Sequence, residues 1–278
     1  MKLTEPPSAG SPDLAGQPSG DFRVEIASNG IAHVVLGHPG KMPCTGIGGH
    51  TALARLWPQL AEAPDVRCIL IRSEGKGFCA GGSPELVQEL LKSGAARLRV
   101  LAEIRAIVQG MIDCDKPIVS AINGAAVGVG LALALLADIS IAAQDAKLID
   151  GHTKIGVAAG DHSVVIWPLL CGLAKSKYYL LLSEPLTGHE AERIGLVSLS
   201  VEASQLDAVS RVIAERLAKG SASAQAFTKR TLNHWLRSAW PAFEHTAALE
   251  ILGFAQPDAV EGVTALAEKR APQFDGTR

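Results

Sequence analysis

A glycine-spaced turn in the middle of the chain has residue types and spacing suited to holding an anionic oxygen. Residues 123–130 read NGAAVGVG and separate an apolar run rich in β-branched residues from an Ala/Leu run that favours a helix. A strand–turn–helix of this kind leaves backbone N–H groups unpaired at the positive end of the helix, where negative charge is stabilised. We therefore expect the segment from Lys116 to Asp161 to form the floor of an active site.

A second glycine-rich segment has the same organisation. Residues 73–85 read SEGKGFCAGGSPE and follow a short β-branched strand candidate at 66–72. Ser83 is a good helix N-cap and Pro84 suits the first helical position, so this loop should turn directly into a helix. The chain thus contains two strand–loop–helix units.

Strand-like and helix-like segments alternate around these loops. Residues 22–28 and 31–36 are strand candidates joined by Asn29-Gly30, a strong signal for a β-hairpin. Apolar periodicity and end signals predict helices at 51–62, 97–111, 164–173, 177–182, 187–194, 206–218 and 224–236. Early strands with crossover helices and a late helical section indicate an α/β core with a helical appendage.

Composition excludes several classes of protein. With 278 residues, 47% of them hydrophobic, the chain can bury a substantial core as one large domain with a smaller appendage. With a net charge of −2 and scattered basic residues, the sequence has no basic patch of the kind that binds nucleic acid. The uncharged span 117–137 has the roughly 20 residues of a membrane helix, but a proline, an asparagine and three glycines interrupt it. We expect neither a nucleic-acid nor a membrane partner.

The cysteines and the first residues bear on the compartment. The five cysteines, at 44, 68, 79, 114 and 171, are widely spaced and have no C-x-x-C pair and no histidine at ligand spacing. They are typical of buried thiols in a reducing compartment, with no metal site, and predict a cytoplasmic protein. Residues 1–20 are rich in Pro, Ser and Gly and lack the apolar segment of a secretory signal, so we expect a disordered tail.

Several short motifs together resemble the crotonase, or enoyl-CoA hydratase/isomerase, superfamily. They are PDVR at 64–67, GFCAG at 77–81, KPI through NG at 116–124, GVG at 128–130, AERIGLV at 191–197, and EG through EKRAP at 261–272. They run in the family's order from about residue 22 to the C-terminus.

The resemblance implies a fold and a class of substrate. The fold would be a spiral of β-β-α units over residues 21–210, followed by a helical trimerisation region over 211–278. Members bind acyl-CoA thioesters, so CoA enters only as part of the substrate and no separate cofactor is expected. Partners are further copies of the same chain, as a trimer or a dimer of trimers. By motif position, the backbone N–H groups of Ala80 and Val129 would form an oxyanion hole for the thioester carbonyl.

The acid–base residues depart from the family pattern. Two glutamates serve the hydratases of this superfamily, and their positions fall here on Ala132 and His152. His152 and Asp161 are then the nearest candidates for proton transfer, because a histidine with a pKa near 6.5 acts as acid or base at neutral pH. Asp161 would either orient His152 or act itself.

Structural interpretations of both residues remain open. Asp161 follows a glycine and precedes an apolar helical run, so it is also a good helix N-cap. His152 also has an interpretation as a loop histidine that satisfies backbone groups. Asp161-His162-Ser163 is not expected to be a nucleophilic triad, because adjacent side chains point apart and no G-x-S-x-G turn is present.

Contacts with CoA and with the acyl group are predicted from the same motifs. Gly81, Gly128 and Gly130 would approach the thioester, and Lys41 and Lys269, with Lys76, are candidates for the phosphates. Leu266 stands where the family often has an aromatic residue, and Leu86, Trp57 and Trp167 are candidates to line the acyl pocket.

The prediction is therefore an acyl-CoA enzyme of the hydratase/isomerase superfamily that stabilises a thioester enolate. The alternatives are an isomerase, a C–C bond hydrolase or a decarboxylase acting on an acyl-CoA, or a non-catalytic acyl-CoA binder. A dinucleotide-binding fold is disfavoured, because the glycine spacing is not G-x-G-x-x-G. The identity of the acyl group is not readable from the sequence.

Overall fold

The computed structural model describes residues 20–275, so the predicted tail lies outside the described residues except for Gly20. The chain then opens with the predicted hairpin. Strands β1 (Phe22–Ile26) and β2 (Ile31–Leu36) pair antiparallel. Gly30 in the connection has φ +80°, the left-handed conformation for which the Asn-Gly pair is suited.

A six-stranded sheet forms the centre of the molecule, in the order β1-β2-β3-β4-β6-β9. Every pair after the hairpin is parallel, and parallel neighbours need crossover connections, which are mostly helices here. The further strands are β3 (Cys68–Ser73), β4 (Ile118–Ile122), β6 (Ile139–Ala143) and β9 (Leu199–Val201). The first crossover helices are α1 (Ile47–Glu62), α2 (Pro84–Lys92) and α3 (Gly94–Asp113).

A second sheet of three strands gives the chain its repeating unit. Its order is β5 (Ala126–Val127), β7 (Lys147–Ile149) and β8 (Leu186–Thr187). Consecutive strands enter one sheet and then the other before a helix follows, as in β4–β5–α4 (Val129–Leu135) and β6–β7–α5 (Ser163–Leu182). This is the expected β-β-α pattern.

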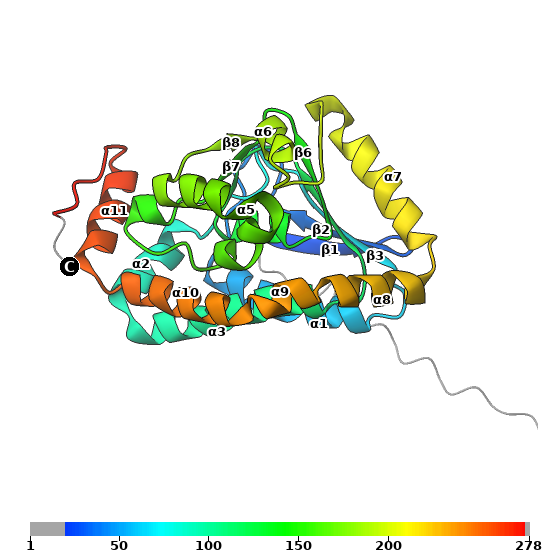
Figure 1. The fold of residues 1–278 in the computed structure, drawn as a ribbon, viewed down its shortest axis with the longest axis horizontal. Coiled ribbons are helices and arrows are strands. Elements are labelled where there is room, and N and C mark those ends of the chain that lie inside the picture. The colour runs from blue at the N-terminus through cyan, green and yellow to red at the C-terminus, as the bar shows by residue number, and fades with distance from the viewer. Residues whose placement is uncertain (1–19, 276–278) are drawn as a thin grey trace, which may run out of the picture.

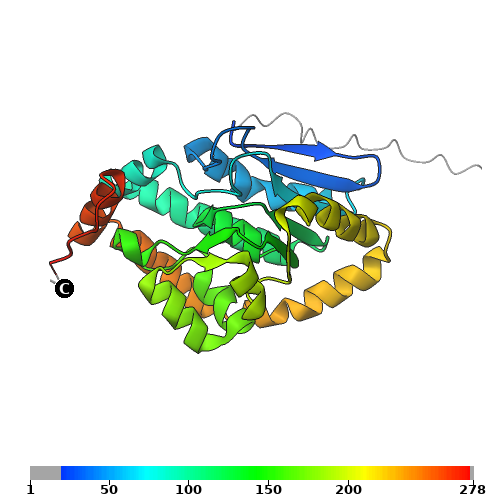
Figure 2. The same ribbon diagram turned by 90° about the horizontal axis from the view of Figure 1, so that it is seen from above.

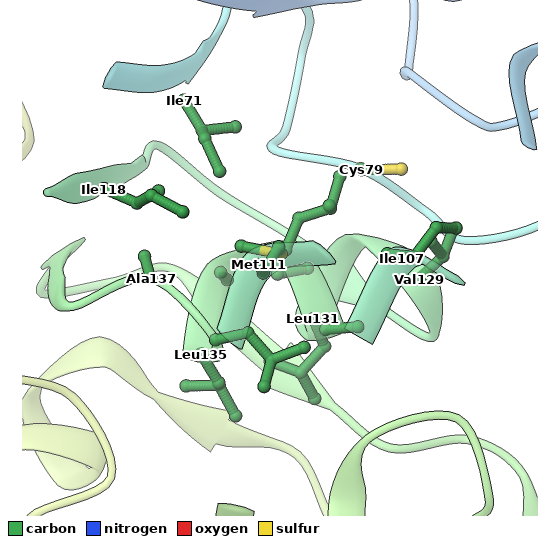
Figure 3. Packing of buried hydrophobic residues seen from close by; sticks show 14 of the residues in the cluster. Ile71, Cys79, Ile107, Met111, Ile118, Val129, Leu131, Leu135 and Ala137 are labelled. Atoms are coloured by element: carbon green, nitrogen blue, oxygen red, sulfur yellow. The ribbon is translucent and has the colours of Figure 1, made fainter. Parts of the chain in front are cut away.

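The span 117–137 is divided among β4, β5 and α4 rather than forming one membrane helix. Its side chains join a continuous buried cluster, and Figure 3 shows Ile118, Leu131 and Leu135 packed with residues of α3 and β3. Among residues 20–275, α5 is the one helix whose length and composition would allow it to cross a membrane, a test that core helices also pass.

The C-terminal section is helical, as predicted, although two boundaries differ. Element α5 consists of two helical segments, as predicted, but the break between them is at Gly172, where φ is +75° and ψ is 160°. The single helix predicted at 224–236 is split at Asn233 into two helices. The helices after the second sheet are α6 (Gly188–Arg193), α7 (Leu206–Ala218), α8 (Ala222–Leu232), α9 (His234–Ser238), α10 (Trp240–Gly253) and α11 (Pro257–Ala267), with 3-10 turns at Thr153–Ile155 and Ala203–Gln205.

These helices pack on the core from two sides. Figure 1 shows α7 against the sheet and a row of α8, α9 and α10 along α3, and Figure 2 shows the same row from above. Helix α7 contacts β3 and β4 and continues across residue 210, where the helical region was predicted to begin after the spiral core. Helix α10 contacts both α3 and α5, so it reaches the interior of the molecule.

An ion pair between buried Lys229 and partly exposed Asp138 joins the row of helices to the core. Lys229 of α8 places its Nζ 2.7 Å from Oδ2 of Asp138, and it donates to the carbonyl of Lys116 at 2.9 Å. The same Asp138 oxygen accepts the N–H of Ile118 at 2.7 Å, at the start of β4. Burial raises the pKa of Asp138, and Lys229 opposes that effect. The pair therefore holds α8 against the strand that leads into the glycine-spaced turn.

We predict that Lys229→Ala lowers the free energy of unfolding by about 1–3 kcal/mol, because it removes charge-assisted hydrogen bonds from the buried Lys229 to Asp138 and to the Lys116 carbonyl. Urea denaturation at one fixed protein concentration measures this change. Lys219→Ala is the matched control, since the Lys219 side chain is 78% exposed and its pair with Glu215 spans 3.9 Å. That control should shift stability by less than about 0.5 kcal/mol. Equal effects of the two variants would contradict the anchoring role.

Candidate active site

The two glycine-rich loops lie against each other through backbone hydrogen bonds. The N–H of Val127 donates to the carbonyl of Cys79 at 2.9 Å, and the N–H of Phe78 donates to that of Ala125 at 2.9 Å. A Cβ on Gly130 would lie 2.5 Å from the Cys79 oxygen, and one on Gly81, where φ is +91°, would lie 3.1 Å from the Val127 oxygen. Glycine is therefore required at both positions for the loops to approach.

One of the two expected oxyanion donors is free, and the other is not. Val129 is the first residue of α4, and the described hydrogen bonds give its N–H no acceptor. Gly128 takes the positive φ of +49°, so Val129 needs no left-handed conformation. The N–H of Ala80, in contrast, donates to the carbonyl of Pro43 at 2.7 Å. This hydrogen bond corrects the assignment of Ala80.

Gly82 provides the free N–H of the first loop. The described hydrogen bonds give its N–H no acceptor, although the neighbouring Gly81 carbonyl and Ser83 N–H both pair with Thr45. Gly82 and Val129 line the same cavity. The sequence could not indicate that the Ala80 N–H is occupied, because the pairing with Pro43 depends on a segment far away in the chain.

A cavity of about 420 Å³ extends from these loops, within the size range of small-molecule sites. Its wall is largely apolar and comes from α2, α3 and α4, with Leu86, Leu90, Val100, Ile104, Ile107 and Ala132 among its residues. Leu86, a residue predicted to line the acyl pocket, is thus part of the wall of this cavity. Trp57 and Trp167 are instead fully buried in the core and do not line this cavity.

One polar residue stands in the apolar part of the wall. His50 of α1 lines the cavity, and its Nδ1 lies 2.7 Å from Oε2 of Glu103 on α3. Both residues of this pair are buried. Thr51 donates to the other oxygen of Glu103 at 2.5 Å. His50 and Thr51 lower the pKa of Glu103 despite its burial, so this carboxylate is ionised.

His152 lies at the opposite side of the cavity in a group of carboxyl residues. Its Nδ1 is 2.9 Å from Oδ1 of Asp150, whose other oxygen accepts the Ser163 hydroxyl. Its Nε2 lies 3.8 Å from Oδ2 of Asp161 and 3.7 Å from Oε1 of Glu250. His152 is therefore held on one nitrogen and placed between two carboxyl groups on the other.

Asp161 pairs with its neighbour rather than capping a helix. The N-cap of α5 is His162, and Asp161 accepts from Nδ1 of His162 at 2.5 Å. The indole N–H of Trp167 points to Nε2 of His162 at 3.4 Å, which makes Nδ1 the protonated nitrogen. The expectation that these adjacent side chains do not meet was wrong for Asp161 and His162. Ser163 bonds Asp150 instead, so no nucleophilic triad forms.

Burial and mutual pairing separate the pKa values of this cluster. Burial favours neutral Asp150, but the His152 imidazole outweighs it and holds the Asp150 pKa well below its ordinary value. Burial also opposes charge on His152, yet the surrounding carboxyl groups, led by Asp150, raise its pKa well above the ordinary value. Against burial, His162 and His152 lower the pKa of Asp161. Burial raises the pKa of Glu250 to about 8, reinforced by Asp161 and opposed by His152.

Sequence reasoning missed Asp150 and Glu250. Asp150 had a local signal, since it stands two residues before His152 at the end of a strand. Glu250 had none, because it lies in the C-terminal section, on α10. Lys154 and Leu266 also line the cavity, and Leu266 does so from α11. The three lysines proposed for CoA are exposed and lie outside the cavity wall, namely Lys41, Lys76 and Lys269.

Three members of the cluster have ligand atoms close enough for a metal ion. These atoms of Asp150, Asp161 and His162 lie within 4.8 Å of one another. They already have protein partners, because Asp150 holds His152 and Ser163 while Asp161 holds His162. The donors thus form a closed network of hydrogen bonds.

The fold and the site define an α/β enzyme scaffold in which free backbone N–H groups and a buried acid–base cluster face one apolar cavity. The family model for enoyl-CoA hydratase/isomerase matches residues 27–277. This chain belongs to that family, and its β-β-α spiral with a helical C-terminal region is the crotonase fold.

Similar proteins span nearly the whole chain. A protein of Rhodobacter capsulatus named "Probable enoyl-CoA hydratase" is 33% identical over 265 residues, 92% of this chain and 98% of its own length. The 1,2-epoxyphenylacetyl-CoA isomerase of Escherichia coli is 26% identical and covers 92% of this chain and 99% of its own. The crystal structure of an enoyl-CoA hydratase/isomerase from Mycobacterium paratuberculosis has a TM-score of 0.83 at 30% identity, over 88% of this chain and 98% of that one.

We predict that His152 is an imidazolium at about pH 7.5, because the neighbouring carboxylates stabilise its charge. Nitrogen chemical shifts in an NMR titration of labelled protein measure this state. Asp150→Asn should lower the midpoint of His152, since it removes the nearest negative charge. His33 is an internal control in the same spectrum, because burial lowers its pKa. A His152 midpoint at or below about 6.5 would contradict the prediction.

Proposed function

We propose that this enzyme binds an acyl-CoA with an apolar acyl group and forms an enolate of its thioester. The carbonyl oxygen accepts from the N–H groups of Gly82 and Val129, and His152 and Asp161 transfer the proton. One observation carries this assignment: the free N–H groups and the His152–Asp161 pair face the same apolar cavity. No cofactor is needed beyond the CoA of the substrate.

The backbone donors act on the charge that develops during the reaction. Removal of a proton next to a thioester carbonyl moves negative charge onto the carbonyl oxygen. Fixed N–H dipoles in a water-poor site stabilise that oxygen without reorganising, and a single donor contributes about 10²–10³ in rate in other enzymes. The rigid contact of the two loops through Val127 and Cys79 keeps both donors in position.

The cluster supplies a base and an acid. Asp161 is a carboxylate at neutral pH, because His162 and His152 lower its pKa, and it is placed to accept a proton. The protonated His152 balances its charge and can return a proton. At the position of the first hydratase glutamate, Ala132 offers no titratable group to the cavity. An arrangement with one cluster of acid–base groups favours removal and return of a proton, which is isomerisation, over addition of water.

Hydration is the second candidate. Two carboxyl groups, those of Asp161 and Glu250, flank His152 and differ in protonation. Such a pair is able to activate a water and protonate a carbon. The 33% identical relative is named as a hydratase.

The proposed function predicts the behaviour of a panel of 2-enoyl-, 3-enoyl-, β-keto- and cyclic acyl-CoAs incubated with the protein in D₂O. Mass spectrometry should show isomerisation and uptake of deuterium into the acyl group, whereas hydration would add one water. His152→Ala and Asp161→Asn should each lower kcat/KM at least about 10²-fold, because each removes a proton-transfer group.

Two outcomes would overturn this assignment. Full turnover in both variants would remove the acid–base role of His152 and Asp161. Binding of the esters to the unmodified protein without exchange or turnover would instead favour a non-catalytic acyl-CoA binder.

We also propose that the protein assembles as a homotrimer or a dimer of trimers. Large apolar side chains are exposed on α5, α8 and α9, including Leu170, Leu173, Phe227, Leu232 and Trp235. Residues of these three helices line a common groove of about 530 Å³. A surface that exposes several large apolar side chains on three helices is typical of an interface between subunits.

Trp235→Glu should therefore shift the mass measured by light scattering towards the monomer, because it places a charge in the apolar surface. Trp235 is 69% exposed, and the matched control is Leu98→Glu, at a residue of α3 that is 70% exposed. The control should leave the mass unchanged. A monomeric unmodified protein at micromolar concentration would contradict the proposed assembly.

A further inference from the structure

Glu250 is a buried carboxyl group to which the isomerisation proposed above gives no role. It belongs to α10, is 5% exposed and lines the cavity. Its Oε1 lies 3.7 Å from Nε2 of His152, and its Oε2 is buried without a hydrogen-bond partner among the described residues. A buried glutamate is normally paired, because an unpaired polar atom in the interior is unfavourable by about 1–3 kcal/mol.

The surroundings of Glu250 keep it close to the cluster and free of cations other than His152. The described ion pairs give it no lysine or arginine partner. The Glu250 side chain fits here because residue 160 is a glycine. A Cβ at Gly160 would lie 2.7 Å from Oε2 and 2.6 Å from Cβ of Glu250. Burial raises its pKa to about 8, so Glu250 carries a proton at neutral pH.

The imidazole of His152 thus stands between two unlike carboxyl groups. Nε2 is 3.8 Å from Asp161 on one side and 3.7 Å from Glu250 on the other. Asp161 is ionised and Glu250 is protonated. Two carboxyl groups whose environments separate their protonation states are suited to the roles of base and acid.

We propose that Glu250 is a further catalytic residue, the proton donor of the reaction, and that His152 relays a proton between Asp161 and Glu250. This inference rests on the proposed function and names the group that completes it. It also gives the C-terminal helical region a chemical role, because Glu250 reaches the cavity from α10.

The proton steps balance for a 3-enoyl thioester. Asp161 takes a proton from the carbon next to the carbonyl, and the electron pair of the broken C–H bond spreads into a dienolate held at the carbonyl oxygen. The O–H bond of Glu250 then breaks, and a C–H bond forms at the far carbon of the conjugated system to give the 2-enoyl product. His152 passes its Nε2 proton to the Glu250 carboxylate and takes the proton from Asp161, which restores the starting state.

Glu250→Gln tests the donor, because glutamine has the same shape but cannot give up a proton. With a straight-chain 3-enoyl-CoA in D₂O, we expect kcat for the 2-enoyl product to fall at least about 10²-fold with KM little changed. Deuterium exchange next to the carbonyl should persist, since that step belongs to Asp161. Glu250→Asp should recover part of the lost kcat.

Stability measurements separate a chemical effect from misfolding. The folded-state pKa of Glu250, about 8, exceeds its ordinary 4.5, so the unmodified protein loses stability as the pH rises between these values. Glu250→Gln removes this loss, and it should melt at least as high as the unmodified protein at about pH 7.5. Glu244→Gln is the matched control on the same helix, because its side chain is 32% exposed and pairs with Arg105 at 2.9 Å. This control should keep the original kcat.

The outcomes distinguish this inference from the proposed function. Unchanged kcat in Glu250→Gln would overturn the donor role, as would exchange without any 2-enoyl product in the unmodified protein. Loss of both exchange and turnover in a stable Glu250→Gln variant would also overturn it and make Glu250 a positioning residue for His152. Absence of exchange and turnover in the unmodified protein would instead reject the proposed function itself.

Discussion

The close contact between the two glycine loops is the constraint on which the rest of the site depends. The Val127-to-Cys79 hydrogen bond of 2.9 Å ties the end of one loop to the other, and side chains at Gly81 or Gly130 would force them apart. The loops come from different β-β-α units, so their contact fixes how successive turns of the spiral stack. It also leaves the N–H groups of Gly82 and Val129 at the head of one cavity. The packing of the two loops therefore determines where these two free N–H groups lie.

The acid–base cluster is positioned by elements that follow this contact in the chain. Asp150 and His152 come directly after β7, whose partner β5 leads into α4, and Asp161 precedes α5. Hydrogen bonds to Ser163 and His162 fix the two aspartates before any substrate is present. Such prior arrangement is favourable for catalysis because no reorganisation is needed during the reaction. The buried, unpaired Glu250 works against stability, as is common for groups retained at functional sites.

Local sequence patterns predicted most of the fold. The hairpin follows from Asn29-Gly30, and Ser83 caps α2 by accepting the N–H of Leu86, as its place before Pro84 predicted. Prediction from the sequence failed where the role of a residue depends on partners that are distant in the chain. The N–H of Ala80 is hydrogen-bonded to the carbonyl of Pro43. Glu250 reaches the site from a helix about a hundred residues beyond His152, and its position depends on how α10 packs on α3 and α5. Spacing within one segment contains no information about either contact.

The proposed oxygen site and the cluster are built from different kinds of group. With Asp150 and Asp161 ionised, the cluster contains two carboxylates. An enolate oxygen placed against these carboxylates would be repelled in a medium of low dielectric constant. Backbone N–H groups bear partial positive charge and never titrate, so they bind that oxygen equally well at any pH. Ala132, at the position that the resemblance assigns to the first hydratase glutamate, adds no carboxylate to the cavity wall. The proposed anion site thus consists of backbone N–H groups, and the proposed proton site consists of side chains that titrate.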